Sequence, residues 1–319
     1  MNQKFYSWAE EYLFFPTPFQ KLISLLFLPF TLIYMIIIAF KRAGAKPVDF
    51  GVPVISIGNI IVGGSGKTPF TIFLAKNREN VAIILRGYGR KSKGLYVISK
   101  RGNILENVDV SGDEAMLLAQ TLPNATIIVS EDRSKGILKA KELGCKLVLL
   151  DDGFSKYNIA KFDILLRPKE EPTNILCLPS GGYREPKMMY SMAHMVLREG
   201  EDFQRHVMYK LNGQNMSILP QKLLLLTAIS KPNRLLDFLP ETTKMEAFPD
   251  HYEFTQEDID RILSEYPEYS IITTSKDLVK LKKFNLNDIY LMDLELQLND
   301  KVDLTPIEDF IKAYQNHYA

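Results

Sequence analysis

The sequence predicts an α/β protein in which a parallel sheet is covered by helices, with a second, smaller α/β lobe after it. Two observations favour this class. From residue 47 onward, short apolar runs rich in β-branched residues alternate with helical stretches, and a glycine-rich turn joins the first such strand to the first such helix. The 319 residues, 46% of them hydrophobic, are enough for two domains with sizeable cores.

An uncharged apolar stretch precedes this region. Residues 22–40, LISLLFLPFTLIYMIIIAF, are followed by the basic pair Lys41 and Arg42. Their length roughly matches the hydrocarbon core of a bilayer, and the basic residues that follow argue against a cleaved signal peptide. We therefore expect residues 1–46 to contain an N-terminal membrane helix, with the next domain on the cytoplasmic side. A buried hairpin broken at Pro29 is the alternative.

The remaining elements follow from hydrophobic patterning. Buried strands are predicted at residues 52–57, 81–85, 125–129 and 146–150, with helices in TPFTIFLAK, GDEAMLLAQTL and RSKGILKAKELG. A second unit is predicted from a strand at 222–230, a helix in NRLLDFL, a strand at 270–274 and a terminal helix, after a linker at 212–221. These patterns predict a core domain at 47–215 and a C-terminal lobe at 216–319.

The turn after the first strand, GNIIVGGSGKT at residues 58–68, almost matches a phosphate-binding loop, but Ile61 stands where the usual pattern has its first glycine. Such a turn points backbone N–H groups at phosphate oxygens. Lys67 would then reach the β- and γ-phosphates, and Thr68 would ligate magnesium. A tight turn with an exposed lysine is the alternative. The predicted nucleotide-binding residues are Ile61, Val62, Gly63, Gly64, Ser65, Gly66, Lys67 and Thr68.

A magnesium phosphate site also needs carboxylates, and KLVLLDDGF supplies them. Asp151 and Asp152 follow a buried strand, at the sheet edge where open α/β sheets bind ligands. Two adjacent carboxylates there can hold the metal directly or through water. The alternative is an ordinary acidic turn.

Other polar loops offer weaker candidates. RGYGRKSKG carries Arg86 and Tyr88 and is either a phosphate contact or a solvated hairpin. An arginine fork at Arg184, in LPSGGYREP, suits a transferring phosphoryl group. Asp113, in SGDEAMLLA, sits at a helix start, where a carboxylate also favours the helix dipole. Of the four histidines, only His251 has suggestive neighbours, in FPDHYEF.

Composition limits the possible partners. The net charge is +1, from 39 basic and 38 acidic residues, so it gives no argument for nucleic acid. Two cysteines form no disulfide framework and no paired-cysteine metal site, and they fit a reducing cytoplasm. No obligate protein partner is evident in the sequence.

Together these motifs resemble the tetraacyldisaccharide 4'-kinase family of lipid A biosynthesis. The resemblance covers nearly the whole chain in order: the N-terminal apolar segment, SIGNIIVGGSGKTP, LRGYGR, SGDEA, SEDRSKG, LDDGF, LPSGGYREP, FPDHYEF and TSKD. GNxxVGGxGKTP is the family's own form of the phosphate loop, so Ile61 fits it. The resemblance implies magnesium-dependent transfer of the ATP γ-phosphate to the 4'-hydroxyl of a tetraacylated disaccharide 1-phosphate. It also implies an inner-membrane protein whose P-loop kinase core faces the cytoplasm.

The resemblance further implies roles for individual residues. Asp113 and His251 would form the pair that activates the sugar hydroxyl, and Arg184 with Glu185 would lie at the site between lobes. The carried-over roles are ATP and magnesium binding for Lys67 and Thr68, the metal-phosphate network for Asp151 and Asp152, and substrate contacts for Arg86, Tyr88, Arg133 and Glu185.

The chain departs from the family at one motif. The family usually continues its acidic motif as DDGFQHR or DDAFQHR, whereas this chain has DDGFSKY, with Ser155, Lys156 and Tyr157 as the last three residues. We expect altered contacts in the acidic loop and retained activity. The alternatives are an inactive relative, a membrane-tethered P-loop ATPase or nucleotide switch without lipid kinase activity, and a non-catalytic membrane scaffold.

Overall fold

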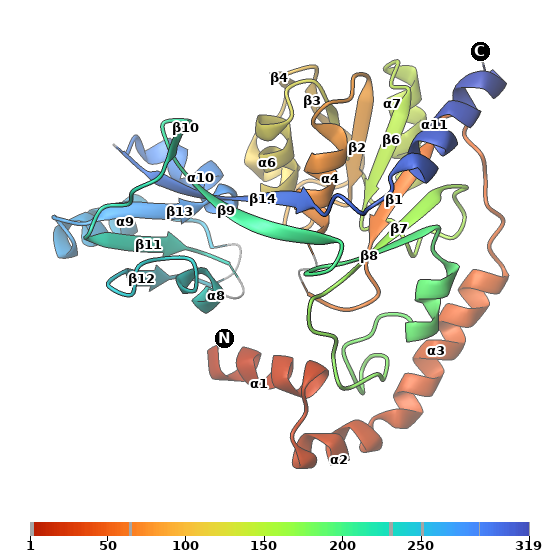
Figure 1. Ribbon diagram of the computed structural model, residues 1–319, viewed down its shortest axis with the longest axis horizontal. Coiled ribbons are helices and arrows are strands. Elements are labelled where there is room, and N and C mark those ends of the chain that lie inside the picture. The colour runs from red at the N-terminus through yellow and green to blue at the C-terminus, as the bar shows by residue number, and fades with distance from the viewer. Residues whose placement is uncertain (1–2, 64–65, 230–231, 250–251, 287, 319) are drawn as a thin grey trace. The chain divides into compact units, whose positions relative to one another are not determined.

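The structure is a computed structural model that describes residues 3–63, 66–229, 232–249, 252–286 and 288–318 (Figure 1). Its contacts divide the chain into two compact units, each assembled from separate stretches. The first unit contains residues 1–85, 132–204 and 298–319, and the second contains 86–131 and 205–297. The linear domain boundaries after residues 46 and 215 stay a prediction of the sequence.

A parallel sheet forms the centre of the first unit. Its strands lie in the order β2, β6, β1, β7, β8, and every neighbouring pair is parallel. All residues of β1, β2 and β6 are buried, which explains why these strands are continuous apolar runs. The bounds are β1 (Val54–Gly58), β2 (Val81–Leu85), β6 (Leu147–Asp151), β7 (Phe162–Arg167) and β8 (Met195–Arg198).

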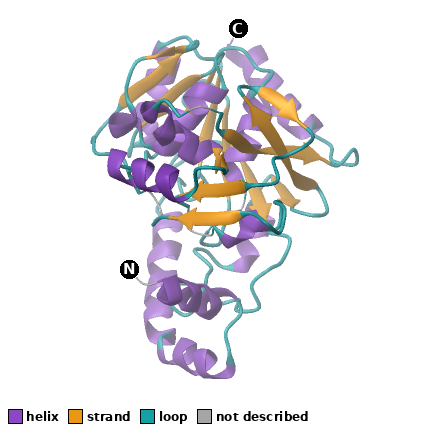
Figure 2. Ribbon diagram, turned by 90° about the vertical axis from the view of Figure 1, so that its left-hand side faces the viewer, coloured by secondary structure: helices purple, strands orange, loops and turns teal. Residues whose placement is uncertain are grey.

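Figure 2 shows helices beside the strands. The first unit contains the helices α4 (Lys67–Ala75), α7 (Arg133–Glu142) and α11 (Thr305–Tyr318) and the 3-10 helix η1 (Lys187–Met192). Helix α4 packs on β1 and β6, while α7 packs on β2 and β6. Gly136 allows α7 to approach closely, because a Cβ at that position would lie 2.9 Å from Cγ2 of Ile84. The strands and helices predicted for this region are confirmed.

The apolar N-terminal stretch does not fold as the single membrane helix that the sequence predicts. It folds as α2 (Pro18–Leu26) and α3 (Leu28–Ala43), preceded by α1 (Gln3–Phe14). Among the described residues, no single helix is long and apolar enough to cross a membrane, and α2 with α3 meets that test only as a pair bent by 58°. Pro29, in the first turn of α3, causes the break, because it lacks an N–H and its ring clashes with the carbonyl four residues earlier. The single N-terminal membrane helix is therefore not supported, and neither is a buried hairpin.

The second unit holds two groups of strands. Antiparallel β4, β3 and β5 lie in that order, and a separate sheet has the order β10, β9, β14, β13, β11, β12. Alternate residues of β11 enter two apolar clusters, one with Leu224 and Leu226 and the other with Leu223 and Leu225. The run KLLLL is therefore a strand buried on both faces. The predicted linker at 212–221 contains β10, which pairs with β9 as an antiparallel hairpin.

The bounds of the second unit's strands are β3 (Tyr96–Lys100), β4 (Asn103–Ile104), β5 (Thr126–Val129), β9 (Phe203–Leu211), β10 (Gln214–Met216), β11 (Leu223–Thr227), β12 (Lys244–Ala247), β13 (Ser270–Thr274) and β14 (Tyr290–Leu298). Its helices are α5 (Val108–Ser111), α6 (Asp113–Thr121), α8 (Asn233–Leu236), α9 (Gln256–Glu265), α10 (Ser275–Leu281) and η2 (Lys282–Phe284).

Candidate functional site

The glycine-rich loop joins β1 to α4, as the sequence predicts. Gly63 and Gly66 have φ values of 99° and 79°, in the left-handed region that favours glycine. Gly66 is the N-cap of α4, so Lys67 and Thr68 form its first turn. The free N–H groups and the dipole of this helix end suit a phosphate. Two of the predicted loop residues, Gly64 and Ser65, lie outside the described residues.

Ile61 and Val62 have packing roles in this loop. Ile61 is 5% exposed, lies in an apolar cluster with Phe154 and Tyr183, and forms an isolated antiparallel bridge with Tyr183. Val62 donates its N–H to the carbonyl of Gly182 at 2.9 Å. These contacts join the phosphate loop to the loop at 178–186. A glycine at position 61 would lack the side chain that packs against Phe154 and Tyr183.

A charged network lies beside the loop. Lys67 Nζ donates to Asn59 Oδ1 at 3.1 Å and lies 3.8 Å from Asp152 Oδ1. Arg184 donates two hydrogen bonds to the carboxylate of Asp152, at 2.9 and 2.8 Å, and one to the Asn59 carbonyl at 2.8 Å. Burial alone would raise the pKa of Asp152, but the hydrogen bonds from Arg184 and the charges of Lys67, Arg184 and Arg133 hold it below its ordinary value. Asp152 is therefore an ionised acceptor between two cations.

Sheet topology brings these groups together. Strand β6 lies next to β1 and pairs in parallel, with Ile57 opposite Asp151. The carboxyl ends of both strands therefore meet at one edge of the sheet, which is where such sheets bind ligands. Asp151 is 6% exposed, and Arg133, the first residue of α7, is 4% exposed and donates to the Asp151 carbonyl at 3.4 Å. Arg133, predicted as a substrate contact, thus lies buried behind the acidic pair.

The oxygen donors near the loop fit magnesium. Thr68, Asp151 and Asp152 offer a hydroxyl and two carboxylates, the hard ligands that this ion prefers. In the part of the chain that the structure describes, no group of three or more His, Cys, Asp and Glu side chains could hold a metal alone. Magnesium usually takes one or two carboxylates and completes its shell with water and substrate phosphates.

Helix α3 holds the loop that carries Arg184. Thr31 Oγ1 donates to Ser180 Oγ at 2.7 Å and accepts from the Ser180 N–H at 3.1 Å. The hydroxyl of Tyr34 donates to the backbone carbonyl of Arg184 at 2.8 Å. The apolar N-terminal segment is therefore part of the scaffold of this site, which its sequence did not indicate.

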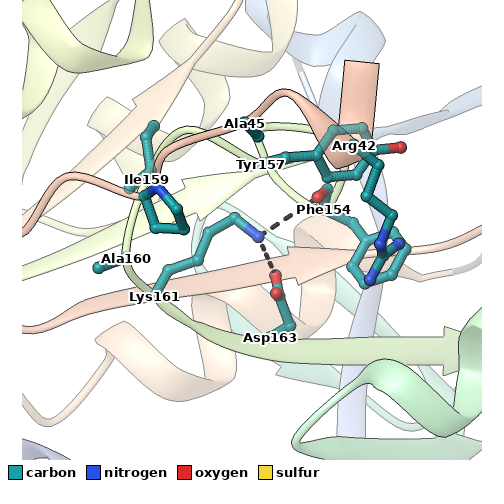
Figure 3. Close-up of a pocket in the computed structure, with 9 residues that line it drawn as sticks. Arg42, Ala45, Phe154, Tyr157, Ile159, Ala160, Lys161 and Asp163 are labelled. Carbon is teal, nitrogen blue, oxygen red and sulfur yellow. Dashed lines mark hydrogen bonds and ion pairs between the residues drawn. The ribbon is translucent and has the colours of Figure 1, made fainter. Parts of the chain in front are cut away.

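The last turn of α3 reaches Glu185. Arg42 Nη1 lies 3.6 Å from Glu185 Oε2, and the Arg42 guanidinium lies 5.2 Å from the centre of the Tyr157 ring. Figure 3 shows Arg42 beside Phe154 and Tyr157 at a cavity of about 450 Å³. Burial raises the pKa of Glu185, and the Tyr157 hydroxyl and the charge of Arg42 offset only part of that effect. Helix α3 thus places a guanidinium beside Tyr157 and Glu185.

The second unit contains the candidate base. Asp113 begins α6, and Lys280 Nζ, from α10, lies 3.0 Å from Asp113 Oδ2. A cavity of about 380 Å³ beside the pair is lined by Gly89, Gly112 and Lys91 among other residues. His251, the predicted partner of Asp113, lies outside the described residues.

The remaining predicted residues lie at the surface of the second unit. Arg86 is exposed and Tyr88 is 72% exposed, in the loop after β2. In the same loop Arg90 pairs with Glu131 and donates to the Gly94 carbonyl at 2.6 Å, which orders the loop.

Sequence reasoning missed Asn59 and Lys280. The position of Asn59, directly after the strand that precedes the loop, could have indicated its role. The position of Lys280 could not, because Lys280 belongs to a lysine-rich stretch, LVKLKK, that has the pattern of a solvated helix face.

Comparisons with known proteins agree on one family. The family model described as Tetraacyldisaccharide-1-P 4'-kinase matches residues 23–311. Proteins named Tetraacyldisaccharide 4'-kinase from Aliarcobacter butzleri and Helicobacter pylori are 60% identical over 315 residues and 45% identical over 306 residues. The first match covers 99% of this chain and 100% of its relative, and the second covers 96% and 95%.

A solved structure agrees with these relatives. The crystal structure titled as an "apo" form of LpxK from Aquifex aeolicus in complex with ATP is similar with a TM-score of 0.74 and 28% identity. The match covers 92% of this chain and 99% of that one.

Proposed function

Because this chain belongs to the tetraacyldisaccharide-1-P 4'-kinase family, we propose a role for individual residues in the family's reaction. The protein is an ATP-dependent kinase of lipid A biosynthesis that phosphorylates the 4'-hydroxyl of tetraacyldisaccharide 1-phosphate. The network of Lys67, Arg184, Asp152 and Asn59 at the start of α4 carries the proposal. It joins two cations and a carboxylate to a helix end suited to phosphate.

We assign phosphate binding to the first turn of α4 and to Lys67 and Arg184. Asp152 and Asn59 hold these two cations in place, which reduces the conformational entropy lost when a triphosphate binds. Thr68, Asp151 and Asp152 would hold magnesium. When bound, magnesium supplies charge neutralisation at the transferred phosphoryl group.

We assign acceptor activation to Asp113, supported by His251. A sugar hydroxyl does not ionise at neutral pH, so a positioned carboxylate that accepts its proton lowers the barrier to attack. The proposed substrate contacts are Arg86, Tyr88, Arg133 and Glu185. Exposure supports Arg86 and Tyr88 as direct contacts, whereas burial favours an indirect role for Arg133 and Glu185.

The proposal is tested by incubating the protein with ATP, magnesium and tetraacyldisaccharide 1-phosphate. The expected result is a bisphosphorylated lipid in amounts equal to the ADP formed. ADP release at the same rate without the lipid, and no lipid product, would instead indicate the membrane-tethered ATPase or nucleotide switch.

We also propose that α2 and α3 contact the inner membrane and keep the catalytic residues on its cytoplasmic face. The two helices bury polar residues and expose apolar ones, the reverse of a helix on a water-soluble protein. Gln20, Ser24 and Thr31 are at most 4% exposed. The exposed apolar residues, each 56% exposed or more, include Phe19, Leu22, Leu26, Phe30, Ile33 and Phe40. A bilayer surface is the environment in which such a face is stable, and it also supplies the lipid substrate.

The triple variant Leu22→Ser, Leu26→Ser and Phe30→Ser should bind anionic lipid vesicles at least about tenfold more weakly, because three apolar side chains no longer enter the bilayer. Vesicle co-sedimentation measures the change. The matched control is Ile104→Ser with Leu105→Ser, which removes exposed apolar side chains from the second unit. Equal loss in both variants, or none in the triple variant, would show that another surface carries the membrane contact.

Arg184→Lys should lower turnover about tenfold, since an ammonium cannot make the two parallel bonds that a guanidinium makes with a carboxylate. Steady-state kinetics with ATP and the lipid acceptor gives the change. Arg198→Lys, which alters an arginine on β8, should leave turnover unchanged. If both variants keep the parent turnover, the two hydrogen bonds from Arg184 to Asp152 have no part in the reaction.

A further inference from the structure

We propose that Lys280 is a positioning residue for Asp113, holding that buried carboxylate in place for the acceptor hydroxyl. This inference rests on the proposed role of Asp113 in the kinase reaction. No motif of the sequence identifies Lys280. The geometry of the second unit points to it.

The first observation is a buried ion pair. Lys280 Nζ lies 3.0 Å from Asp113 Oδ2, with the two side chains 5% and 11% exposed. Apart from this ion pair, no described residue accepts a hydrogen bond from the Lys280 ammonium. A buried ammonium loses most of its hydration, which costs free energy unless a partner compensates. Its position is thus explained by Asp113 and by the cavity that both residues line.

The second observation is that α10 is fixed at its start. Asp277 accepts hydrogen bonds from the hydroxyls of Thr227 at 2.7 Å and Thr274 at 2.9 Å, and Thr274 caps the helix. Lys280 follows Asp277 by three residues, so it lies near the same face of α10. The TSKD motif therefore ties Lys280 to strands β11 and β13, and helix α10 packs against α6, which carries Asp113.

Other charged side chains also lie near Asp113. Lys91 is 62% exposed and lies 3.0 Å from Asp109 and 3.3 Å from Glu253. The remaining charged neighbours are exposed Lys283 at the cavity, Glu114 on α6, and Arg90, which is buried and paired with Glu131. Solvent screens the exposed groups, whereas Lys280 is a buried cation in direct contact with Asp113.

This pair has a chemical consequence. A general base must lie within hydrogen-bonding reach of the proton that it accepts. With the ammonium at 3.0 Å, the carboxylate is held at the cavity wall. Removing the ammonium should therefore leave a base that is poorly placed for the acceptor hydroxyl.

The experiment measures kcat and the KM for ATP for Lys280→Met and Lys280→Arg. We expect Lys280→Met to lower kcat about tenfold and to leave the KM for ATP unchanged. Lys280→Arg should restore most of the activity. The control is Lys282→Met, which removes a lysine that joins the same region to α6 through Gln120 and should leave kcat unchanged. A loss of kcat that Lys280→Arg does not restore and that follows a lower thermal stability would overturn the proposal.

A double-mutant cycle keeps the test informative if Lys280→Met alone does not fold. The variant with both Asp113→Asn and Lys280→Met carries no unpaired buried charge. If Lys280 acts through Asp113, adding its substitution to Asp113→Asn should not lower turnover further. A further loss would refute the proposal. If Asp113→Asn itself keeps full turnover, the assignment of the base fails, which is a different result from a failure of Lys280.

Discussion

Lys67→Ala is expected to abolish measurable lipid phosphorylation, lowering turnover by at least about 10³-fold. The ammonium of Lys67 is the charge on α4 that stands nearest Asp152, and Asn59 fixes it at 3.1 Å. Charge that develops on a transferring phosphoryl group needs such a preorganised cation, because a flexible replacement would lose entropy when it is ordered. Alanine leaves the helix end in place but removes this charge.

The matched control for this result is Lys76→Ala, which removes an exposed lysine at the other end of α4. Turnover and nucleotide binding are measured for both variants, together with thermal unfolding. Lys76→Ala should behave as the parent protein. Unchanged turnover in Lys67→Ala would remove the loop from the mechanism.

Asp113→Ala should lower turnover on the order of 10²-fold or more while ATP affinity stays nearly intact. The reason is that a general base acts on the acceptor hydroxyl and not on the nucleotide. His251→Ala should cost less, since its proposed role is to support the carboxylate. Steady-state kinetics beside direct nucleotide binding separates these effects.

Glu114→Ala is the matched control for Asp113→Ala. Both acids occupy the first turn of α6, so both substitutions remove the same favourable interaction with the helix dipole. Only Asp113→Ala should reduce turnover strongly. If Asp113→Ala mainly weakens ATP binding, Asp113 supports nucleotide or metal and the base lies elsewhere.

Much of the phosphate site was predictable because its signals are local. A strand, a glycine turn and a helix start follow one another in GNIIVGGSGKT, and an acidic pair follows a buried strand in KLVLLDDGF. Parallel strands end at the same sheet edge, so the two motifs were expected to meet there. The register of β1 with β6 confirms that they do.

Contacts between distant parts of the chain were not predictable. The sequence singled out Arg184 and Asp152 separately. The two hydrogen bonds between them, and the bond from Arg184 to Asn59, which lies 125 residues away in the sequence, depend on how the loop at 178–186 packs against the end of the sheet. Lys280 meets Asp113 only because α10 packs on α6. A pattern of apolar and polar residues does not encode such partners.

The sequence by itself determined the α/β class, the phosphate loop, the acidic pair and the family. Each of these can be recognised from neighbouring residues or from the order of the motifs along the chain. Only the tertiary structure decided that the apolar stretch bends near Phe27, turns Gln20 and Thr31 inward, and holds the Arg184 loop. Hydropathy reports how apolar a segment is. Which face of the segment packs against the rest of the protein, and which face stays exposed, depends on the polar partners that lie near it once the chain has folded.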